Sequence, residues 1–324
     1  MTVRRIRYVD MAKGLALVMV ILSHTDGAMW AVPFDNFSLA VFFVCAGFTT
    51  SAGSLSLRRK FRGLVVPYVT LSAVCLLYSL AVGREVTPQA LAGIAYSRFC
   101  LYPGTDAPGQ VVLMTLNNSV LWFLTALFSS YVVLRLILLP DSVSRQALMA
   151  SGSLVVAGMA DFLPVLLPWS LDSAFFFAPM MWCGFRMRAR DTLACVGLPA
   201  ASGLFVVYGV LFCITGMTNY SVRDFGDSLI LTFAAGVSGS AGLLAVCRWL
   251  EQSGRRVPLV EKLNAQALTV FGLQLIFIGL AWRVCVRFVP EDWLALTVVA
   301  EVVAACVGGY FAGRVMRSVL PFYR

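Results

Sequence analysis

Charged side chains are scarce in this sequence. Asp, Glu, Lys and Arg together make up 13% of its 324 residues, hydrophobic residues make up 60%, and the mean hydropathy is +0.84. A soluble domain carries about 25% charged residues, because its surface must face water. A chain with so little charge cannot cover such a surface. The composition therefore excludes a soluble globular protein and predicts one that is embedded in lipid.

Histidine is almost absent, since His24 is the only one in the chain. Any mechanism or metal site that needs two histidines is therefore excluded. The nine cysteines form no Cys-x-x-Cys pair and lie mostly within apolar segments. That distribution is typical of small buried side chains rather than of metal ligands or disulfides. We expect no metal site.

Long apolar segments fill most of the chain. A membrane-spanning helix needs about 20 predominantly apolar residues. We predict ten such segments: Ala12–Val32, Phe37–Gly53, Leu64–Gly83, Val120–Leu139, Ala147–Leu163, Leu171–Met187, Thr192–Ile214, Ser228–Leu250, Ala265–Val286 and Trp293–Met316. No soluble domain or strong repeat interrupts them. The sequence predicts an all-α, polytopic transmembrane helical bundle formed by a single domain, residues 1–324.

The positions of the basic residues predict the orientation of this bundle. The net charge is +9, which on its own would also suit a nucleic-acid-binding protein. Of the 25 Lys and Arg residues, 20 lie at the chain ends and in one set of alternate loops, and only five lie in the other set. Because Lys and Arg are enriched on the cytoplasmic side, we expect both termini in the cytoplasm and no nucleic-acid partner. Asp172 is expected in a solvated outer loop.

Lys13 and His24 stand out within the first apolar segment. Eleven positions separate them, which is about 16 Å along an α-helix, so both side chains would lie on nearly one face. Lys13 would lie at the cytoplasmic boundary and His24 deep in the membrane, beside Ser23. Ionisable groups at such depth are costly and usually functional; the alternative is a histidine that only bonds to a neighbouring helix. Glu301 is a candidate to orient His24 or to pair with Arg283.

Five further segments occur in a characteristic order. They are Phe42–Phe48, Arg58–Tyr68, Leu121–Phe128, Phe175–Phe185 and Leu263–Gln274. Together with Asp10, Lys13 and His24, they make the chain similar to the membrane acyltransferase-3 family. The chain departs from the family pattern in four places. Lys13 replaces the usual Arg, Ala46 replaces a Ser, Gln274 replaces a late His, and the Gly and basic residues that the family has before Asn264 are displaced or absent.

The resemblance implies transfer of an acyl group, most often acetyl from acetyl-CoA, to a hydroxyl of a glycan or of a lipid-linked sugar. It makes His24 the catalytic general base. Imidazole suits that role, because it gains and loses a proton near neutral pH and so can take the hydroxyl proton. A developing oxyanion also needs hydrogen-bond donors. The candidates for this or for other substrate contacts are Ser23, Asn117, Asn118 and Trp122.

Acyl-CoA is expected as a co-substrate, and no permanently bound cofactor is expected. The residues that could bind its phosphates are Lys13, Arg58, Arg59 and Arg62. The alternative is that this basic cluster reflects membrane topology and contacts anionic lipid. We expect the cytoplasmic membrane of a bacterium as the location, and lipids, acyl-CoA and the acceptor as partners. Two other functions stay open, namely a transporter or flippase of a small or lipid-linked solute, and a non-catalytic member of the family.

Overall fold

The computed structural model describes residues 6–51, 53, 55–255 and 257–320. Four basic residues of the charge count lie outside them, at positions 4, 5, 256 and 324. Within the described part of the chain there are helices and two isolated β-bridges, Cys100 with Val112 and Asn219 with Asp224, but no strand. The prediction of an all-α protein is confirmed.

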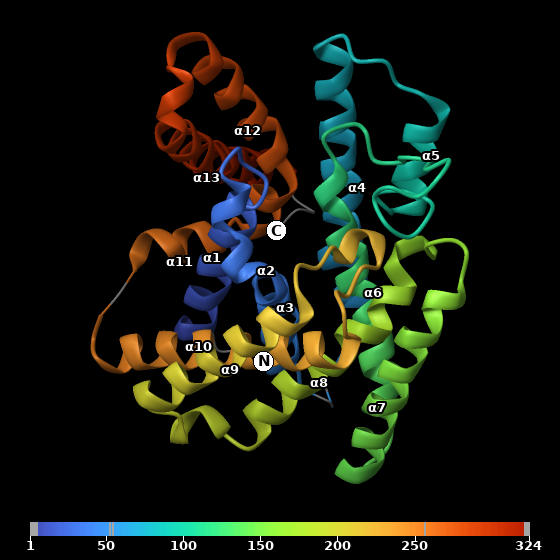
Figure 1. Cartoon of the computed structure of the whole chain (residues 1–324), viewed down its shortest axis with the longest axis vertical. Helices are drawn as coiled ribbons and strands as arrows, with labels where there is room; N and C mark the ends of the chain where they lie inside the picture. Colours follow the sequence, from blue (N-terminus) through green and yellow to red (C-terminus); the bar gives the residue numbers. More distant parts are fainter. Residues whose placement is uncertain (1–5, 52, 54, 256, 321–324) are drawn as a thin grey trace.

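The α-helices follow one another with short 3-10 helices between them (Figure 1). The α-helices are α1 (Arg7–Leu22), α2 (Asp35–Ser38), α3 (Ala40–Phe48), α4 (Leu57–Ala81), α5 (Pro88–Tyr96), α6 (Trp122–Ile137), α7 (Val143–Met159), α8 (Leu171–Ala189), α9 (Leu198–Thr215), α10 (Leu229–Gln252), α11 (Pro258–Asn264), α12 (Ala267–Phe288) and α13 (Leu294–Val319). The 3-10 helices are η1 (Ala28–Trp30), η2 (Val32–Phe34), η4 (Ser119–Leu121), η5 (Ala160–Phe162), η6 (Pro168–Ser170), η7 (Thr192–Cys195), η8 (Tyr220–Val222) and η9 (Glu291–Trp293).

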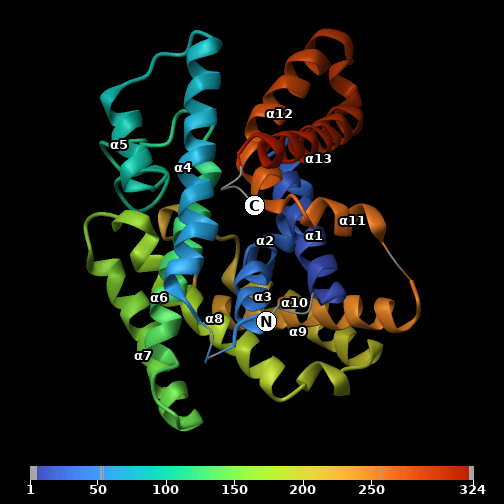
Figure 2. The same cartoon turned by 180° about the vertical axis from the view of Figure 1, so that it is seen from behind.

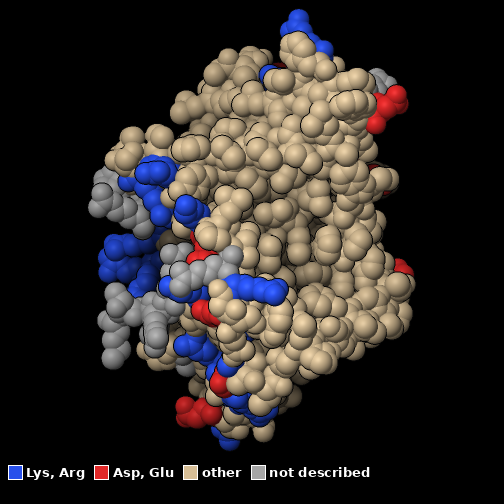
Figure 3. Space-filling model, turned by 90° about the vertical axis from the view of Figure 1, so that its left-hand side faces the viewer, with Lys and Arg blue, Asp and Glu red and all other residues tan. Residues whose placement is uncertain are grey.

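Among the described residues, six helical segments are long and apolar enough to cross a membrane. They are α4, η4 with α6, α9, α10, α12 and α13. Two of them are mostly uncovered by the rest of the protein, since only 17% of the apolar window in α9 and 22% of that in α13 is buried. Figure 3 shows Lys and Arg gathered along one side of the face in view, next to a broad area with almost no charge. These features are those of a multi-pass membrane protein, whose apolar outer surface faces lipid.

The full count of ten spans is not confirmed. Four of the predicted segments correspond to α1, α2 with α3, α7 and α8, and none of these meets the same requirement of length and composition. The 16 residues of α1 extend about 24 Å, which is less than a hydrocarbon core of about 30 Å. In addition, α4 runs along the long axis of the molecule and α10 runs across it (Figures 1 and 2). The candidate spans are therefore not all parallel, as a simple bundle would require.

The tightest helix contact in the core is the crossing of α3 and α8. A Cβ atom added to Gly47 would lie 1.7 Å from the carbonyl oxygen of Met181, and one added to Gly184 would lie 2.0 Å from that of Val44. Only glycine allows the two backbones to approach so closely, and helices inside membranes often pack through such small residues. Beside this crossing, the rings of Phe43 and Phe177 stack with centroids 3.9 Å apart. Two segments of the family pattern, Phe42–Phe48 and Phe175–Phe185, thus pack against each other.

Candidate functional site

His24 lies in the turn that follows α1, and not within a long span. Helix α1 ends at Leu22, whereas the sequence predicted a helical segment through Val32. The side chains of Ser23 and Thr25 explain the early end, because their hydroxyl groups bond to the carbonyls of the last helical turn. Ser23 Oγ donates to Val20 at 2.8 Å, and Thr25 Oγ1 donates to Leu22 at 2.8 Å. Such local bonds compete with the continuing helix.

The imidazole of His24 has a defined orientation. Its Nδ1 atom lies 2.7 Å from the carbonyl oxygen of Val20 and 3.2 Å from Ser23 Oγ. A carbonyl oxygen can only accept, so Nδ1 carries the hydrogen and donates it to Val20. In the neutral ring the lone pair is then on Nε2, which has no partner within the described part of the protein. His24 is thus arranged so that Nε2 can accept a proton.

A cavity of about 480 Å³ adjoins His24, and we call it the His24 cavity. Its walls come from the end of α1, from η1 and η2, from the start of α6, from α12 and from residues 217–221. Two of the predicted oxyanion or substrate residues, Ser23 and Trp122, line the same cavity. The structure therefore brings these two side chains together with the histidine.

A second cavity, of about 310 Å³, contains Lys13, and we call it the Lys13 cavity. Lys60 and Tyr131 face each other in it: Lys60 Nζ donates to the Tyr131 hydroxyl at 2.8 Å and lies 4.0 Å from the centre of its ring. Phe271 of α12 lines both the Lys13 cavity and the His24 cavity. The two cavities therefore adjoin at this one aromatic side chain, with a cation on one side and the histidine on the other.

The predicted Arg58–Arg62 cluster does not act as one unit. Arg58 and Arg59 are exposed in the first turn of α4 and line none of the described cavities. Arg62 lines a third cavity, of about 250 Å³, together with Arg317 of α13. We call this space the Arg62–Arg317 cavity. Only the last arginine of the predicted cluster is therefore close to the cavities.

Asn117 and Asn118 lie away from the His24 cavity and do not line it. Asn117 has a left-handed backbone with φ of 56°, and its Oδ1 accepts a hydrogen bond from Arg84 at 3.0 Å. Asn118 is fully buried, and its Oδ1 accepts from the backbone N–H of Leu116 at 3.1 Å. Both side chains form hydrogen bonds at the turn that precedes η4, and neither contacts His24.

Glu301 is fully buried in α13 and reaches the turn that carries the histidine. Its Oε2 atom accepts a hydrogen bond from the backbone N–H of Asp26 at 3.0 Å. Its Oε1 atom has no partner among the described residues. The sequence suggested a contact with His24 itself or with Arg283, whereas the recorded contact is with the backbone two residues after His24.

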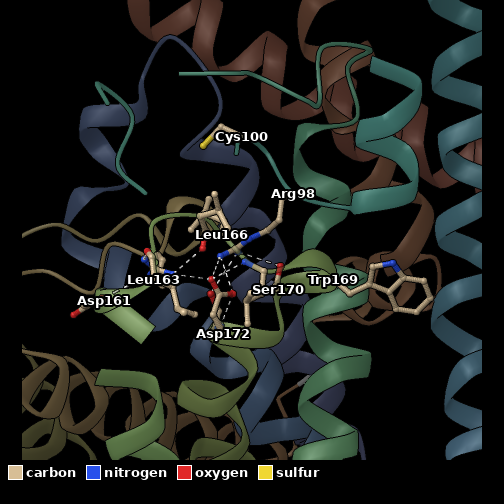
Figure 4. Close-up of polar contacts among 12 residues, drawn as sticks. Arg98, Cys100, Asp161, Leu163, Leu166, Trp169, Ser170 and Asp172 are labelled. Atoms are coloured by element: carbon tan, nitrogen blue, oxygen red, sulfur yellow. Dashed lines mark hydrogen bonds and ion pairs between the residues drawn. The ribbon is translucent and has the colours of Figure 1, made fainter. Parts of the chain in front are cut away.

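A buried ionic cluster, shown in Figure 4, is connected to one wall of the His24 cavity through η8. Arg98 Nη2 donates to both carboxylate oxygens of Asp172 at 2.9 Å, and Arg223 Nη1 donates to Asp172 Oδ2 at 3.3 Å. The prediction of a solvated Asp172 is wrong, because this carboxylate is fully buried between two guanidinium groups. Arg223 follows directly after η8, whose residues Tyr220 and Ser221 line the cavity. The cluster thus anchors one wall of the His24 cavity.

The comparison with known families identifies the family of this chain. Residues 6–312, nearly the whole chain, match the acyltransferase domain family. The chain belongs to the membrane acyltransferase-3 family. No match was found among curated proteins or among solved structures. The family and the apolar helices together make this chain a membrane acyltransferase.

Membership in the acyltransferase-3 family also draws attention to Gln274 of α12. This residue occupies the position at which the family resemblance implies a histidine. Its side chain is fully buried, and neither amide atom has a partner in the part of the chain that the structure describes. Gln274 lies three residues after Phe271, hence on the same side of the helix. The replacement leaves His24 as the only imidazole near the cavities.

Several residues that line the cavities were not singled out from the sequence. Phe271 and Tyr131 carry no signal of their own, because an aromatic residue in an apolar helix is usually part of the core. Arg317 was counted only as a topology signal, whereas Lys60 lies within the Arg58–Arg62 cluster that the sequence suggested for the CoA phosphates. Their role as neighbours of the cavities depends on contacts between helices that are distant in the sequence.

Proposed function

We propose that this chain moves an acyl group, acetyl in the simplest case, from acyl-CoA to a hydroxyl group of a glycan or a lipid-linked sugar. The observation that carries the proposal is the position of His24. Its Nδ1 donates to Val20, and its Nε2, beside a cavity of about 480 Å³, has no partner among the described residues. A general base needs a positioned lone pair and room for the hydroxyl that it deprotonates.

The reaction would proceed by direct attack. Nε2 of His24 removes the proton from the acceptor hydroxyl, and the oxygen forms a bond to the thioester carbonyl carbon. The carbonyl oxygen becomes an oxyanion. Of the predicted donors that line the same cavity, Trp122 could offer its indole N–H, whereas Ser23 would first have to release its hydroxyl hydrogen from the Val20 carbonyl. The carbon–sulfur bond then breaks. The CoA thiolate takes the proton from His24, so that the products are an ester and free CoA.

The donor would enter from the cytoplasmic side, where acyl-CoA is made. In this arrangement the ten predicted segments cross the cytoplasmic membrane of a bacterium, and both termini lie inside. Lys13 and Lys60 meet the phosphates, while the pantetheine arm passes Phe271 toward His24. Acyl-CoA is a substrate here, and the mechanism requires no permanently bound cofactor or metal. Membrane lipids and the acceptor are the other partners.

A direct assay tests this function. Inverted membrane vesicles that contain the protein receive radiolabelled acetyl-CoA, and label is measured in lipid-linked and free sugars. We expect transfer by the wild-type protein and loss of transfer in His24→Gln, because an amide can still donate to the Val20 carbonyl but cannot act as a base. The transfer rate should fall about a hundredfold to ten-thousandfold.

The same assay separates the proposed enzyme from the two alternatives, since neither of them transfers label. A transporter would move the solute without transferring label, and a non-catalytic family member would transfer none. Near-normal turnover in monodisperse His24→Gln protein would contradict the proposed role of His24. Bound but untransferred acetyl-CoA would favour the non-catalytic alternative.

A further inference from the structure

We propose that Arg317 and Arg62 bind the 3′-phosphate of the CoA nucleotide, in the Arg62–Arg317 cavity. This inference rests on the proposed use of acyl-CoA and names the residues that hold the far end of that donor. The cavity of about 250 Å³ lies between the first turns of α4, the connection from α11 to α12, and the last turns of α13.

The two guanidinium groups are available for an anion. Neither arginine has a salt bridge among the described residues, and both side chains are exposed to the cavity and its opening. Arg317 is held in place by one bond, since its Nη2 donates to the carbonyl oxygen of Ala265 on the cavity wall. That bond occupies one N–H of the planar group, and the remaining donors can take a phosphate in a bidentate manner.

The three cavities adjoin one another along the end of α11 and the first turns of α12. Asn264, Ala267 and Leu268 line both the Arg62–Arg317 cavity and the Lys13 cavity. Phe271, one helical turn further on, then joins the Lys13 cavity to the His24 cavity. A long, thin ligand could therefore contact all three spaces at once.

The length of this series suits CoA. From Lys13 to the end of α1 at Leu22 the helix rises about 14 Å, and His24 follows directly. The extended pantetheine arm is comparable in length. With the thioester at His24, the arm leads past Phe271 and places the 5′-diphosphate near Lys13 and Lys60. The adenosine 3′-phosphate lies beyond the diphosphate in CoA, so it would reach the Arg62–Arg317 cavity.

The charges along the series fit the same order. The described residues that line the three cavities include Lys13, Lys60, Arg62 and Arg317 but no Asp or Glu. The carboxylate of Asp10 lies just behind this lining, where it accepts a hydrogen bond from Asn264 at 2.9 Å. The cations in the lining still outnumber it and would attract a ligand with several phosphates. A phosphate of an anionic lipid headgroup shares this chemistry, and the experiment must separate the two sources.

The test is a binding titration in which either the protein lacks the arginine or the ligand lacks the 3′-phosphate. CoA and dephospho-CoA, which lacks only the 3′-phosphate, are titrated by calorimetry into purified protein in neutral detergent. We expect Arg317→Ala to weaken CoA binding about tenfold to a hundredfold, as for the loss of a charge-assisted bond, and to leave dephospho-CoA binding nearly unchanged. Arg317→Lys should lose less, because it keeps the charge and loses only the bidentate fork.

Arg314→Ala is the matched control. Arg314 lies on the same helix, is exposed, and lines none of the three cavities, so its removal changes the net charge equally. We expect no change in the binding of either nucleotide. An equal loss in Arg314→Ala and Arg317→Ala would show a diffuse charge effect and would overturn the proposal.

The remaining outcomes are also decisive. Equal weakening of CoA and dephospho-CoA by Arg317→Ala would overturn the assignment to the 3′-phosphate. Unchanged CoA binding, together with loss of thermal stabilisation by phosphatidylglycerol, would assign the site to lipid instead. If the wild-type protein binds neither nucleotide, the proposed function itself is overturned. If the wild-type protein binds CoA and Arg317→Ala binds it equally well, only the assignment of Arg317 is overturned.

Discussion

The buried carboxylate of Glu301 holds the backbone of Asp26, with 3.0 Å between Oε2 and the amide nitrogen. This bond links α13 to the turn that carries His24, although the two residues are 275 positions apart in the sequence. The position of the catalytic candidate therefore depends on a helix at the opposite end of the chain.

Removing this hydrogen bond should lower the rate of acyl transfer more than it lowers the stability of the fold. We expect Glu301→Leu to reduce the transfer rate about a hundredfold, because a shift of about 1 Å in a catalytic group can have that effect. Glu301→Gln should keep most of the rate, since its amide oxygen can still accept from Asp26. Transfer rates and thermal unfolding in detergent would be measured together. A stable Glu301→Leu protein with normal turnover would show that the link does not position His24.

Two Arg–Asp pairs of equal length allow a controlled test of burial. Arg98 with Asp172 and Arg248 with Asp191 both have 2.9 Å between nitrogen and oxygen, but the first pair is fully buried and the Asp191 side chain is 70% exposed. Asp172→Asn should destabilise the protein by about 3–5 kcal/mol, because it leaves the buried guanidinium of Arg98 without a counter-charge among the described residues and leaves Arg223 with the exposed Asp161 alone. Asp191→Asn should lower the free energy of unfolding by at most about 1 kcal/mol.

Unfolding midpoints in detergent would measure this difference. Since Asp172 also holds the segment after η8, we expect the surviving Asp172→Asn protein to bind CoA normally and to transfer acyl groups slowly. Equal destabilisation by the two substitutions would mean that the buried cluster adds no more to stability than the exposed pair does.

Phe271 separates the Lys13 cavity from the His24 cavity, and its size should control passage between them. The ring is 5% exposed and packs on Phe123 with centroids 4.9 Å apart. We expect Phe271→Trp to reduce kcat/KM for acetyl-CoA about tenfold or more while CoA binding persists. Phe271→Ala should admit longer acyl chains.

The control for Phe271 is Phe311→Trp on α13, where the ring is 57% exposed and lines neither cavity. Both variants need an unfolding measurement, because a larger ring in a packed site costs about 1–3 kcal/mol. An unchanged preference for acyl-chain length in Phe271→Ala would rule out a gate at this position.

The membrane class and the family could be predicted from the sequence, because both depend on local features. Apolar segment lengths and the order of short motifs are visible in the chain itself. The end of α1 was harder to place. Hydropathy extends the segment to Val32, whereas the structure ends the helix at Leu22, where Ser23 and Thr25 bond to the preceding turn.

The sequence could not show which distant residues come together in the folded protein. Arg98, Asp172 and Arg223 lie in three separate parts of the chain, and only the folded structure shows that they share one buried site. Arg317 was one of many basic residues near a helix end, and its position beside Arg62 depends on how α13 packs near α4. In contrast, the grouping of Ser23 and Trp122 with His24 follows the sequence-based choice of candidates.

Helix α10 offers the sharpest test of membrane orientation. It contains 24 residues, which extend about 36 Å, so it is long enough to cross a hydrocarbon core of about 30 Å. Asp227 and Ser253 are exposed just beyond its two ends. The excess of Lys and Arg in one set of loops predicts that Ser253 faces the cytoplasm and Asp227 the outside.

Each position would be replaced by cysteine in turn, after the exposed Cys195 and Cys213 have been changed to serine to lower the background. A membrane-impermeant maleimide is then applied to intact spheroplasts. We expect labelling of Asp227→Cys at once and of Ser253→Cys only after the membrane is permeabilised. The reverse pattern would invert the proposed topology and put the Arg62–Arg317 cavity on the side without acyl-CoA. Labelling of both sites in intact cells would mean that α10 does not cross the membrane, as its direction relative to α4 also allows.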